Sequence, residues 1–342
     1  MPPREGPVGE RPREAPFPAG PLIQARQVEA RHDRIFLLAA LIFVLLPLVM
    51  GRFGIGFLTE ILTWGILAIA YDLLFGYCGL LSLGHSVFFG LGAYGLALSI
   101  ALLGWPVGLA LLLGVAVSAA GAWLIGLFAV RVRGHGFIIV TIIAAAIVFL
   151  LALRWKSLTG GDDGLPFQVA PIPLGFFRLH LDDLVDRYYL VLAFAIGVYY
   201  FVRRLILSPL GRAFELIREN EDRARFIGYD VRRLKLLAFV ISGAVSGVAG
   251  ALYALTSRYA GAEFINWLIA AETMVWTLFG GAGTLFGPVL GTGLLLVAKD
   301  YLSTAFRYTY PIFLGLVIIL VVTFAPRGLV GLIRGRARAH GG

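Results

Sequence analysis

The sequence predicts an all-α fold, a polytopic transmembrane helical bundle of about ten spans. Of its 342 residues, 59% are hydrophobic and 14% are charged, whereas soluble domains are about 45–50% apolar and about 25% charged. Apolar runs recur along the chain, and a run of about 20 residues crosses roughly 30 Å of hydrocarbon as a helix. These runs lack the polar–apolar alternation of a membrane β-barrel. The composition therefore excludes an ordinary soluble domain.

The chain divides into a tail, a transmembrane domain and a second tail. Residues 1–34 are rich in Pro, Arg and Glu, and they hold too little apolar surface to fold, which predicts a disordered cytoplasmic tail. Residues 35–326 form the expected transmembrane domain, and residues 327–342 form a basic cytoplasmic tail. The expected spans lie near residues 35–51, 57–76, 87–104, 106–130, 137–155, 188–203, 236–257, 267–280, 288–304 and 310–325.

The basic residues indicate the orientation of these spans. The formal charge of +9 resides in loops and tails, as expected for a membrane protein with positive residues on the cytoplasmic side. Arg131 and Arg133, the loop over residues 204–235 and the C-terminal tail must then share one face. With ten spans that face also holds the N-terminus, so both termini are expected to be cytoplasmic. We expect contact with membrane lipid and no nucleic-acid partner.

Two glycine-broken segments, one in each half of the chain, do not resemble plain helices. They are Gly76–Gly92 and Gly280–Gly293. Dense glycines and Pro288 weaken a helix, and irregular backbone at membrane depth survives only inside protein or along a wet cavity. Paired segments of this kind often mark a transport pathway. The residues expected to line such a pathway are Ser82, Gly84, His85, Phe88, Glu272, Gly280 and Gly281.

Ionisable groups within spans are costly and favour a protein interior or a cavity. The candidates are Glu60, Asp72, His85, Glu272, Lys299 and Asp300. Glu60, Lys299 and Asp300 lie near helix ends, where hydration is the alternative to a function. Asp72 fits either solvation or a contact between helices. Glu272 and His85 are the candidates for packing, gating or pathway roles.

The sequence lacks the motifs that are typical of several kinds of catalytic and metal-binding sites. The chain has no G-x-x-x-x-G-K-[ST] phosphate loop, and none of its three lysines follows a glycine, so ATP hydrolysis would require another subunit. The five histidines show no metal-ligand spacing, and no G-x-S-x-G elbow occurs. The single cysteine, Cys78, excludes an internal disulfide and is expected to be a small packing residue. We therefore expect a protein that is not an enzyme and uses no metal or cofactor.

The segment over residues 156–187 lies on the outer face in this topology. It opens with KSLTGGDDGLPF, a turn-forming cluster of Gly, Asp and Pro. Thr159, Gly160 and Gly161 begin this cluster. It is either an ordinary surface loop or an outer gate and docking surface for a partner that delivers substrate.

The loop over residues 204–235 is the main charged feature of an oily chain. Ser208 and Pro209 are typical of a helix start. Leu210, Ala213, Phe214 and Ile217 follow at helical spacing and make one apolar face. A second short helix is expected around residues 222–227, ended by Gly228 in a left-handed conformation. The sequence thus predicts an amphipathic helical hairpin.

This hairpin suits a protein partner better than a lipid surface. A basic amphipathic helix can lie on a membrane, but Glu215, Glu219, Glu221 and Asp222 would be repelled by anionic lipid. A mixed-charge surface of defined shape is typical of docking into a protein groove. Directly after the loop, Gly243 and Gly247 have a small-xxx-small spacing, which predicts close helix packing.

Four stretches together resemble one family of permeases. They are GYCGLLSLGHSVFFGLGAY, LTGGDDGL, GRAFELIRENEDRARFIGYDVRRLKLLAFVISG and ETMVWTLFGGAGTLFGPVLG. They resemble the LivM-like membrane permeases of branched-chain amino acid ABC importers, and the likeness covers nearly everything after about residue 57. Urea and short-amide permeases belong to the same family and share RENEDRARFIGY-like and ETMVWTLFGG-like segments. The resemblance leaves both substrate classes open.

The resemblance implies an assembly and a site. The expected partners are a second related permease that forms a heterodimer, two ABC ATPase subunits and a periplasmic substrate-binding protein, in a bacterial inner membrane. It also implies that residues 209–228 dock into the ATPase as a coupling loop. The coupling residues would be Pro209, Gly211, Arg212, Ala213, Ile217, Glu219, Asn220, Glu221 and Gly228. A different class stays open, an ion-coupled secondary transporter that uses Asp72, Glu272 and His85.

Overall fold

The computed structural model describes residues 40–174, 177–305, 315 and 328–329. The chain forms two compact units, residues 1–49 and 50–342. In the first unit, residues 40–45 are helical and continue into a short 3₁₀ turn, η1 (Leu46–Leu48), which has a proline in its first turn. Of the span predicted over residues 35–51, residues 35–39 lie outside the described residues, and so does the span predicted over residues 310–325 apart from residue 315.

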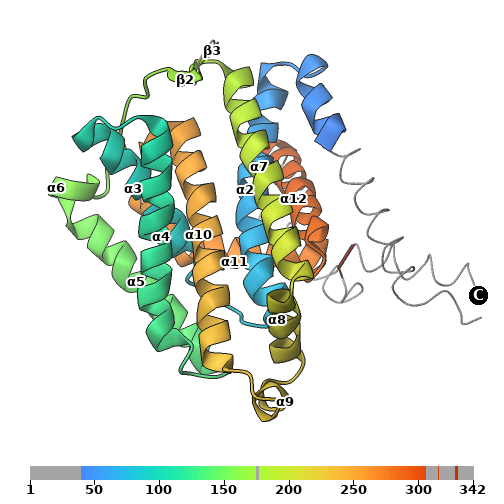
Figure 1. The fold of residues 1–342 in the computed structure, drawn as a ribbon. Helices are drawn as coiled ribbons and strands as arrows, with labels where there is room; N and C mark the ends of the chain where they lie inside the picture. The colour runs from blue at the N-terminus through green and yellow to red at the C-terminus, as the bar shows by residue number, and fades with distance from the viewer. Residues whose placement is uncertain (1–39, 175–176, 306–314, 316–327, 330–342) are drawn as a thin grey trace, which may run out of the picture. The chain divides into compact units, whose positions relative to one another are not determined.

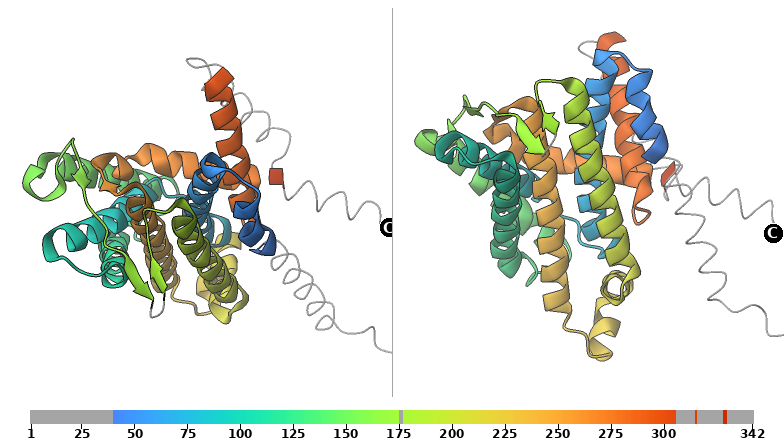
Figure 2. Two further views of the ribbon diagram at one scale, coloured as in Figure 1. Left: turned by 90° about the horizontal axis from the view of Figure 1, so that it is seen from above. Right: turned by 45° about the horizontal axis from the view of Figure 1, so that its top comes forward.

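The second unit is built from helices (Figure 1). In chain order they are α2 (Arg52–Asp72) with the π-helical turn η2 (Leu73–Tyr77), α3 (His85–Leu103), α4 (Val107–Ala129), α5 (His135–Arg154), α6 (Lys156–Thr159), α7 (Leu184–Leu207), α8 (Pro209–Glu219), α9 (Glu221–Phe226), α10 (Val231–Ser257), η3 (Ala262–Ile265), α11 (Trp267–Gly280) and α12 (Phe286–Ala305). Figure 1 and the right view of Figure 2 both place α8 and α9 at one end of this unit.

Within the described residues, six helices are long and apolar enough to cross a membrane. They are α2 with η2, α3, α4, α5, α7 and α10, and their bounds agree within a few residues with six of the predicted spans. The apolar helix α11 has 14 residues, fewer than the roughly 17–25 that a simple crossing takes. The all-α membrane fold is confirmed. The total of ten spans stays a prediction.

The core of the second unit is formed by α2, α3 and α10. In the most apolar windows of these helices, 72%, 67% and 61% of the residues are buried, against 28%, 22% and 28% for α4, α5 and α7. A helix that is apolar all round yet mostly exposed within its own fold fits a lipid environment. The second group therefore faces hydrocarbon or another membrane subunit, and the first group is the internal scaffold.

Small residues bring α3, α4 and α10 into close contact. A Cβ atom on Gly92 of α3 would overlap the Gly247 backbone of α10, and one on Gly247 would overlap Ser118 of α4. The Ser118 hydroxyl lies 2.8 Å from the carbonyl oxygens of both Phe88 and Gly243, so its single hydrogen is shared between α3 and α10. The close packing predicted from the spacing of Gly243 and Gly247 is confirmed.

The two glycine-broken segments are irregular over only part of their predicted length. The chain leaves the π-helical turn at Tyr77 and becomes regular again at His85, while the second break runs from the end of α11 at Gly280 to the start of α12 at Phe286. The irregularity expected across Gly76–Gly92 is thus wrong for its second half, which is α3. The glycines there serve packing, since a Cβ atom on Gly90 would overlap Ile265.

Short strands fasten the loop over residues 160–183 to the end of α10. Strand β1 (Leu165–Pro166) pairs antiparallel with β4 (Tyr259–Ala260), and β2 (Ile172–Leu174) pairs with β3 (Phe177–Leu179). Asp182 accepts a hydrogen bond from Arg258, the residue that ends α10. This bond to the Arg258 guanidinium holds the pKa of the Asp182 carboxyl below its usual range.

Candidate functional site at the charged end

The hairpin of α8 and α9 begins where α7 ends. Pro209 occupies the first turn of α8, as predicted. Ser208 directly precedes α8, as the predicted helix start requires, but its hydroxyl donates to the Leu205 carbonyl at 2.6 Å, back into α7, and makes no capping bond to α8. A serine side chain at such a corner can bond to either helix. Here it terminates the first helix and leaves Pro209 to start the second.

The apolar face of α8 packs against the membrane domain. Ala213, Phe214 and Ile217 are buried, as the helical spacing predicts. Gly211 is buried too, and a Cβ atom there would overlap the backbone of Ile206. The predicted coupling residues Gly211, Ala213 and Ile217 therefore hold the hairpin onto its own subunit. Arg212, Glu219 and Asn220 are exposed on the other side.

The second helix of the hairpin is capped at both ends by suitable residues. The Asn220 side chain accepts from the Arg223 amide at 2.9 Å and caps the start of α9. Gly228 follows the end of α9 with a φ of +98°, a conformation that L-residues rarely adopt. The predicted second helix and its left-handed glycine are confirmed.

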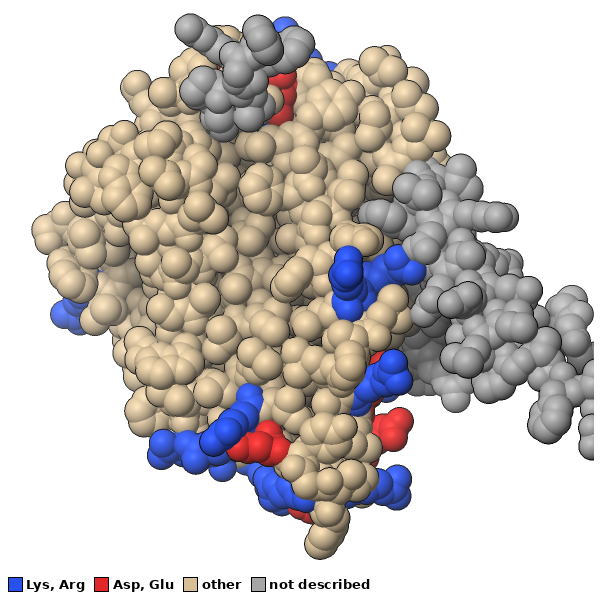
Figure 3. Space-filling model, in the orientation of Figure 1, with Lys and Arg blue, Asp and Glu red and all other residues tan. Residues whose placement is uncertain are grey.

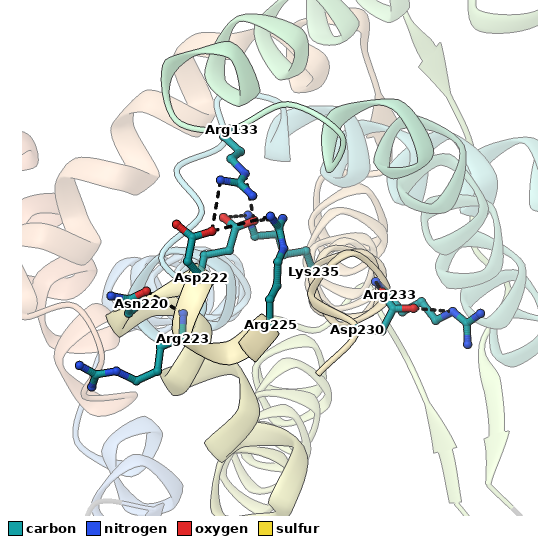
Figure 4. A network of polar contacts seen from close by, with 9 residues as sticks. Arg133, Asn220, Asp222, Arg223, Arg225, Asp230, Arg233 and Lys235 are labelled. Atoms are coloured by element: carbon teal, nitrogen blue, oxygen red, sulfur yellow. Dashed lines mark hydrogen bonds and ion pairs between the residues drawn. The ribbon is translucent and has the colours of Figure 1, made fainter. Parts of the chain in front are cut away.

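A network of ion pairs fixes α9 in place (Figure 4). The Glu221 carboxylate lies 2.6 Å from Lys235 Nζ on α10, 2.5 Å from an Arg225 guanidinium nitrogen and 3.4 Å from Arg133 Nε in the α4–α5 loop. Asp222 also meets Arg133, at 3.4 Å. Lys235 is 4% exposed, so its pair with Glu221 is shielded from solvent in a way that surface pairs are not. The network confirms that the loop of Arg133 and the hairpin share one face.

An apolar tip projects from this charged end. Phe226 is 92% exposed, Ile227 is 63% exposed and Tyr229 is 44% exposed. Most charged side chains on the face seen in Figure 3 gather toward the same end, over α8 and α9. Exposed apolar residues rimmed by polar ones mark interaction sites. The sequence reasoning missed these three residues, and the signal that could have found them is the apolar cluster FIGY at a glycine turn.

Behind the hairpin lies a compact polar junction, which we call the glycine knot: Asp72, Gly76, Gly79, Arg218 and Gly283. Asp72 is completely buried, and its carboxylate accepts from the amides of Gly283 at 2.7 Å and Leu285 at 3.2 Å. Arg218 of α8 donates to the Gly76 carbonyl. Of the two alternatives for Asp72, the structure thus shows a contact between helical segments instead of solvation.

The residues predicted to line a pathway fall into separate groups. Ser82, Gly84, His85 and Phe88 lie together: Ser82 Oγ accepts from the Gly84 amide at 3.2 Å, and the ring centroids of His85 and Phe88 are 5.6 Å apart. His85 is fully buried, with its Nε2 2.6 Å from Ser242 Oγ. Three cavities, of about 650, 320 and 220 Å³, have none of these four residues in their walls. Their pathway role stays a prediction.

The remaining pathway candidates belong to α11 and its C-terminal end. The half-exposed Glu272 side chain lies 3.9 Å from Lys299 Nζ, so the two charges pair across the helices. Gly280 packs against α12, because a Cβ atom there would overlap Gly287. Gly281 follows with a φ of +118° and ends α11. The polar partner of Glu272 is thus Lys299, whereas that of His85 is Ser242.

Two cavities differ in character. One of about 650 Å³ is apolar and lies between α4, α7 and α10, with Phe194, Val240 and Val248 in its wall. Another of about 220 Å³ has Glu60, Arg187 and Tyr253 in its wall. Glu60 is exposed and accepts from the Trp64 indole at 3.3 Å. That placement fits the hydration expected for Glu60.

The outer-loop candidates build a turn. The Thr159 hydroxyl lies 2.5 Å from the Ala152 carbonyl and 2.8 Å from that of Trp155. Gly160 and Gly161 have φ values of +77° and +65°, which favour glycine. Their local role is therefore structural, and the gate or docking function stays a prediction. Among the described residues, no group of His, Cys, Asp and Glu is arranged to hold a metal ion.

The described residues define a multi-pass, all-α membrane protein with a helical hairpin at its charged end. The model of a protein family described as the permease component of branched-chain amino acid transport systems matches residues 53–322. The chain belongs to this family. It is a transport permease, and the predicted role as the permease subunit of an ABC importer is confirmed.

Individual relatives agree with the family. The chain is 31% identical over 331 residues to the high-affinity branched-chain amino acid transport system permease protein LivM of Salmonella typhimurium, covering 91% of this chain and 78% of that protein. LivM of Escherichia coli gives the same identity and coverage. The high-affinity branched-chain amino acid transport system permease protein LivH of Escherichia coli is 25% identical over 79% of this chain and 91% of its own length. No solved structure matches the chain.

Proposed function

We propose that this permease carries branched-chain or other hydrophobic amino acids across a bacterial inner membrane. The substrate class is supported by the similarity to LivM, which is named for the transport of branched-chain amino acids. Escherichia coli has two related proteins, LivM and LivH, that are both named as permease proteins of high-affinity branched-chain amino acid transport, which supports a heterodimer of two related permeases here. Two ATPase subunits and a periplasmic binding protein complete the proposed importer.

The observation that carries the coupling function is the exposed apolar tip on an ion-paired hairpin. Phe226, Ile227 and Tyr229 project from a loop whose other face is buried against the membrane domain. Large aromatic side chains that enter a partner's pocket supply much of the energy of a protein interface. Since this sequence lacks a phosphate loop, we assign ATP hydrolysis to the separate subunit that receives this tip.

The mechanism follows from what the hairpin connects. It joins the end of α7 at Leu207 to the start of α10 at Val231, and Lys235 ties α10 to α9 through Glu221. Closure of an ATPase pair would displace the docked tip and tilt α7 and α10 together. Because α10 belongs to the internal scaffold, this tilt would reach α2 and α3 and switch the access of the pathway.

The docking role predicts that a charge on the apolar tip disconnects the ATPase. We expect Phe226→Asp to lose co-purification with the ATPase subunit and to lower uptake at least about tenfold, because a carboxylate cannot fill an apolar pocket. Gly228→Arg, which removes the left-handed glycine, and Glu219→Arg are expected to lose transport while the protein still inserts. The measurement is pull-down and uptake in membranes that contain all subunits.

The matched control is Arg232→Ala, which alters an exposed residue in the first turn of α10 outside the ion-pair network. It should leave insertion, ATPase binding and uptake unchanged. Full ATPase binding by the Phe226→Asp variant would contradict the docking role of the tip.

A further inference from the structure

We propose that Arg218 transmits the movement of the α8–α9 hairpin to both glycine-broken segments, and that it thereby sets how much transport each hydrolysed ATP produces. This inference rests on the proposed docking of the hairpin to an ATPase. It concerns a step after docking: the mechanical connection from the hairpin to the membrane helices. Arg218 is thus a positioning residue with no contact to the substrate.

The first connection runs from α8 to the end of α2. Arg218 lies in the last turn of α8 and donates from Nη1 to the Gly76 carbonyl. Its aliphatic stem lies against Gly79, where a Cβ atom would stand 2.9 Å from Arg218 Cγ and 3.3 Å from its Cα. Gly79 also has a φ of +75°. The chain at residue 79 therefore has neither the space nor the conformation for a larger residue while Arg218 holds this place.

The π-helical turn explains why the Gly76 carbonyl is available as an acceptor for Arg218. Helix ends leave backbone carbonyls without partners inside the helix, and π-turns often occur at functional sites. Residues Leu73–Tyr77 form such a turn at the end of α2. The Gly76 carbonyl can then accept from a charged side chain, a bond that is stronger than one between neutral groups.

The second connection runs from the same point to the α11–α12 loop. A Cβ atom on Gly283 would stand 3.0 Å from Arg218 Nη1 and 3.2 Å from the Gly76 carbonyl oxygen. The guanidinium, the end of α2 and the α11–α12 loop therefore meet at one place. Asp72 closes the junction by accepting from the Gly283 and Leu285 amides.

This loop is held in a conformation that it would not adopt alone. Gly283 has a φ of +76°, and Leu285, a residue with a full side chain, has a φ of +59°. Such backbone persists only when its surroundings impose it. The two hydrogen bonds that Asp72 accepts from backbone amides of this loop impose the conformation here. A displacement of Arg218 would therefore act on a loop that is already strained, as well as on the end of α2.

An arginine suits this connection better than a lysine. Its planar group presents several donors in a fixed fork, whereas a lysine is a compact point charge. One guanidinium can thus bond to Gly76 and still lie against Gly283. The chain separates Arg218 from Gly76 by 142 residues, so this contact directly joins the coupling loop to the first half of the chain.

The test is the ratio of solute transported to ATP hydrolysed, measured on the complete transporter reconstituted with its partner permease, ATPase subunits and binding protein. Arg218→Gln removes the charge and the fork, and Arg218→Lys keeps the charge alone. We expect Arg218→Gln to co-purify with the ATPase and hydrolyse ATP while the transport ratio falls at least about tenfold. Arg218→Lys should give an intermediate ratio.

Two further variants separate coupling from folding. Gly79→Ala leaves Arg218 in the chain but displaces its stem, so it should also lower the transport ratio. Arg204→Gln changes an exposed arginine at the end of α7 and should leave the ratio unchanged. An unchanged ratio in both Arg218→Gln and Gly79→Ala overturns the proposal.

Failure of docking gives a different result from failure of this connection. If Arg218→Gln loses ATPase co-purification, Arg218 belongs to the docking surface and the connection is refuted, while the docking function stands. If the Phe226→Asp variant still binds the ATPase subunit, the proposal that the apolar tip is the docking site is refuted. The co-purification experiment and the transport ratio therefore report on the two proposals separately.

Discussion

Buried polar residues in this bundle are satisfied by partners that lie far away in the chain. The Asp72 carboxylate accepts hydrogen bonds from two backbone amides in the loop after α11. His85 faces Ser242, whose hydroxyl lies 2.5 Å from the Ala70 carbonyl. Since a hydroxyl has one hydrogen, Ser242 donates to Ala70 and accepts from His85 Nε2–H. This arrangement uses the imidazole as a connection between α2, α3 and α10.

The His85–Ser242 connection predicts a measurable loss of stability. Ser242→Ala would leave the buried Nε2–H without its acceptor, which costs about 1–3 kcal/mol. The control is Ser246→Ala, because the Ser246 hydroxyl donates only within its own helix, to the Ser242 carbonyl at 3.0 Å. Thermal unfolding of the purified protein in detergent should show a lower Tm for Ser242→Ala than for Ser246→Ala. Equal values would contradict a structural role for the His85 connection.

At the scale of elements, the contact between α3, α4 and α10 depends on the absence of side chains. Gly92, Gly114 and Gly247 lie where the helix backbones approach, and each would meet a neighbouring helix if it carried a Cβ atom. In lipid, such close approach and its van der Waals contacts replace the hydrophobic effect as the force between helices. This explains why a core of membrane helices places glycines where a soluble core would place leucines.

Filling this contact should push the three helices apart. We expect Gly247→Val to destabilise the protein by about 1–3 kcal/mol or more, because the added carbons would overlap Ser118. Gly108→Ala on α4 is the control, since no atom lies within 4 Å of a Cβ atom there, and alanine favours a helix. Thermal unfolding would show a large decrease in Tm for the first variant and none for the second. A tolerated valine at residue 247 would refute the packing.

At the scale of the whole molecule, the chain combines a buried scaffold of helices with an exposed hairpin. The helices α2, α3 and α10 form the buried scaffold, and the hairpin between α7 and α10 carries the apolar tip. The glycine knot lies between them. A movement of the hairpin can therefore be transmitted to both glycine-broken segments through contacts that the structure shows.

This architecture predicts that ATP drives transport. Vesicles that contain the permease pair, the ATPase subunits and the binding protein should accumulate a branched-chain amino acid only with ATP on the ATPase side. An ion gradient alone should not drive uptake, because His85 is fully buried in its bond to Ser242 and Asp72 bonds to backbone amides. Uptake driven by the gradient alone would favour the ion-coupled class. A binding protein that selects urea or a short amide would reassign the substrate.

Local patterns were sufficient for the long membrane helices and for the hairpin of this fold. Apolar runs locate the membrane helices, and the spacing of Ala213, Phe214 and Ile217 predicts the buried face of α8. Gly228 marks the end of α9 by its left-handed backbone. Each signal acts between neighbouring residues, within the one or two turns over which helix periodicity and capping operate. The hairpin is therefore predictable from its local sequence alone.

The contacts that join these elements depend on tertiary structure. Asp72 and Gly283 are 211 residues apart, and His85 and Ser242 are 157 residues apart. Local periodicity cannot predict such a pair, because its formation depends on how the helices between the two residues pack. The sequence by itself determined the membrane helices, the family and the charged hairpin. Packing decided that Asp72 would hold a loop, that Arg218 would join two segments and that Phe226 would remain exposed.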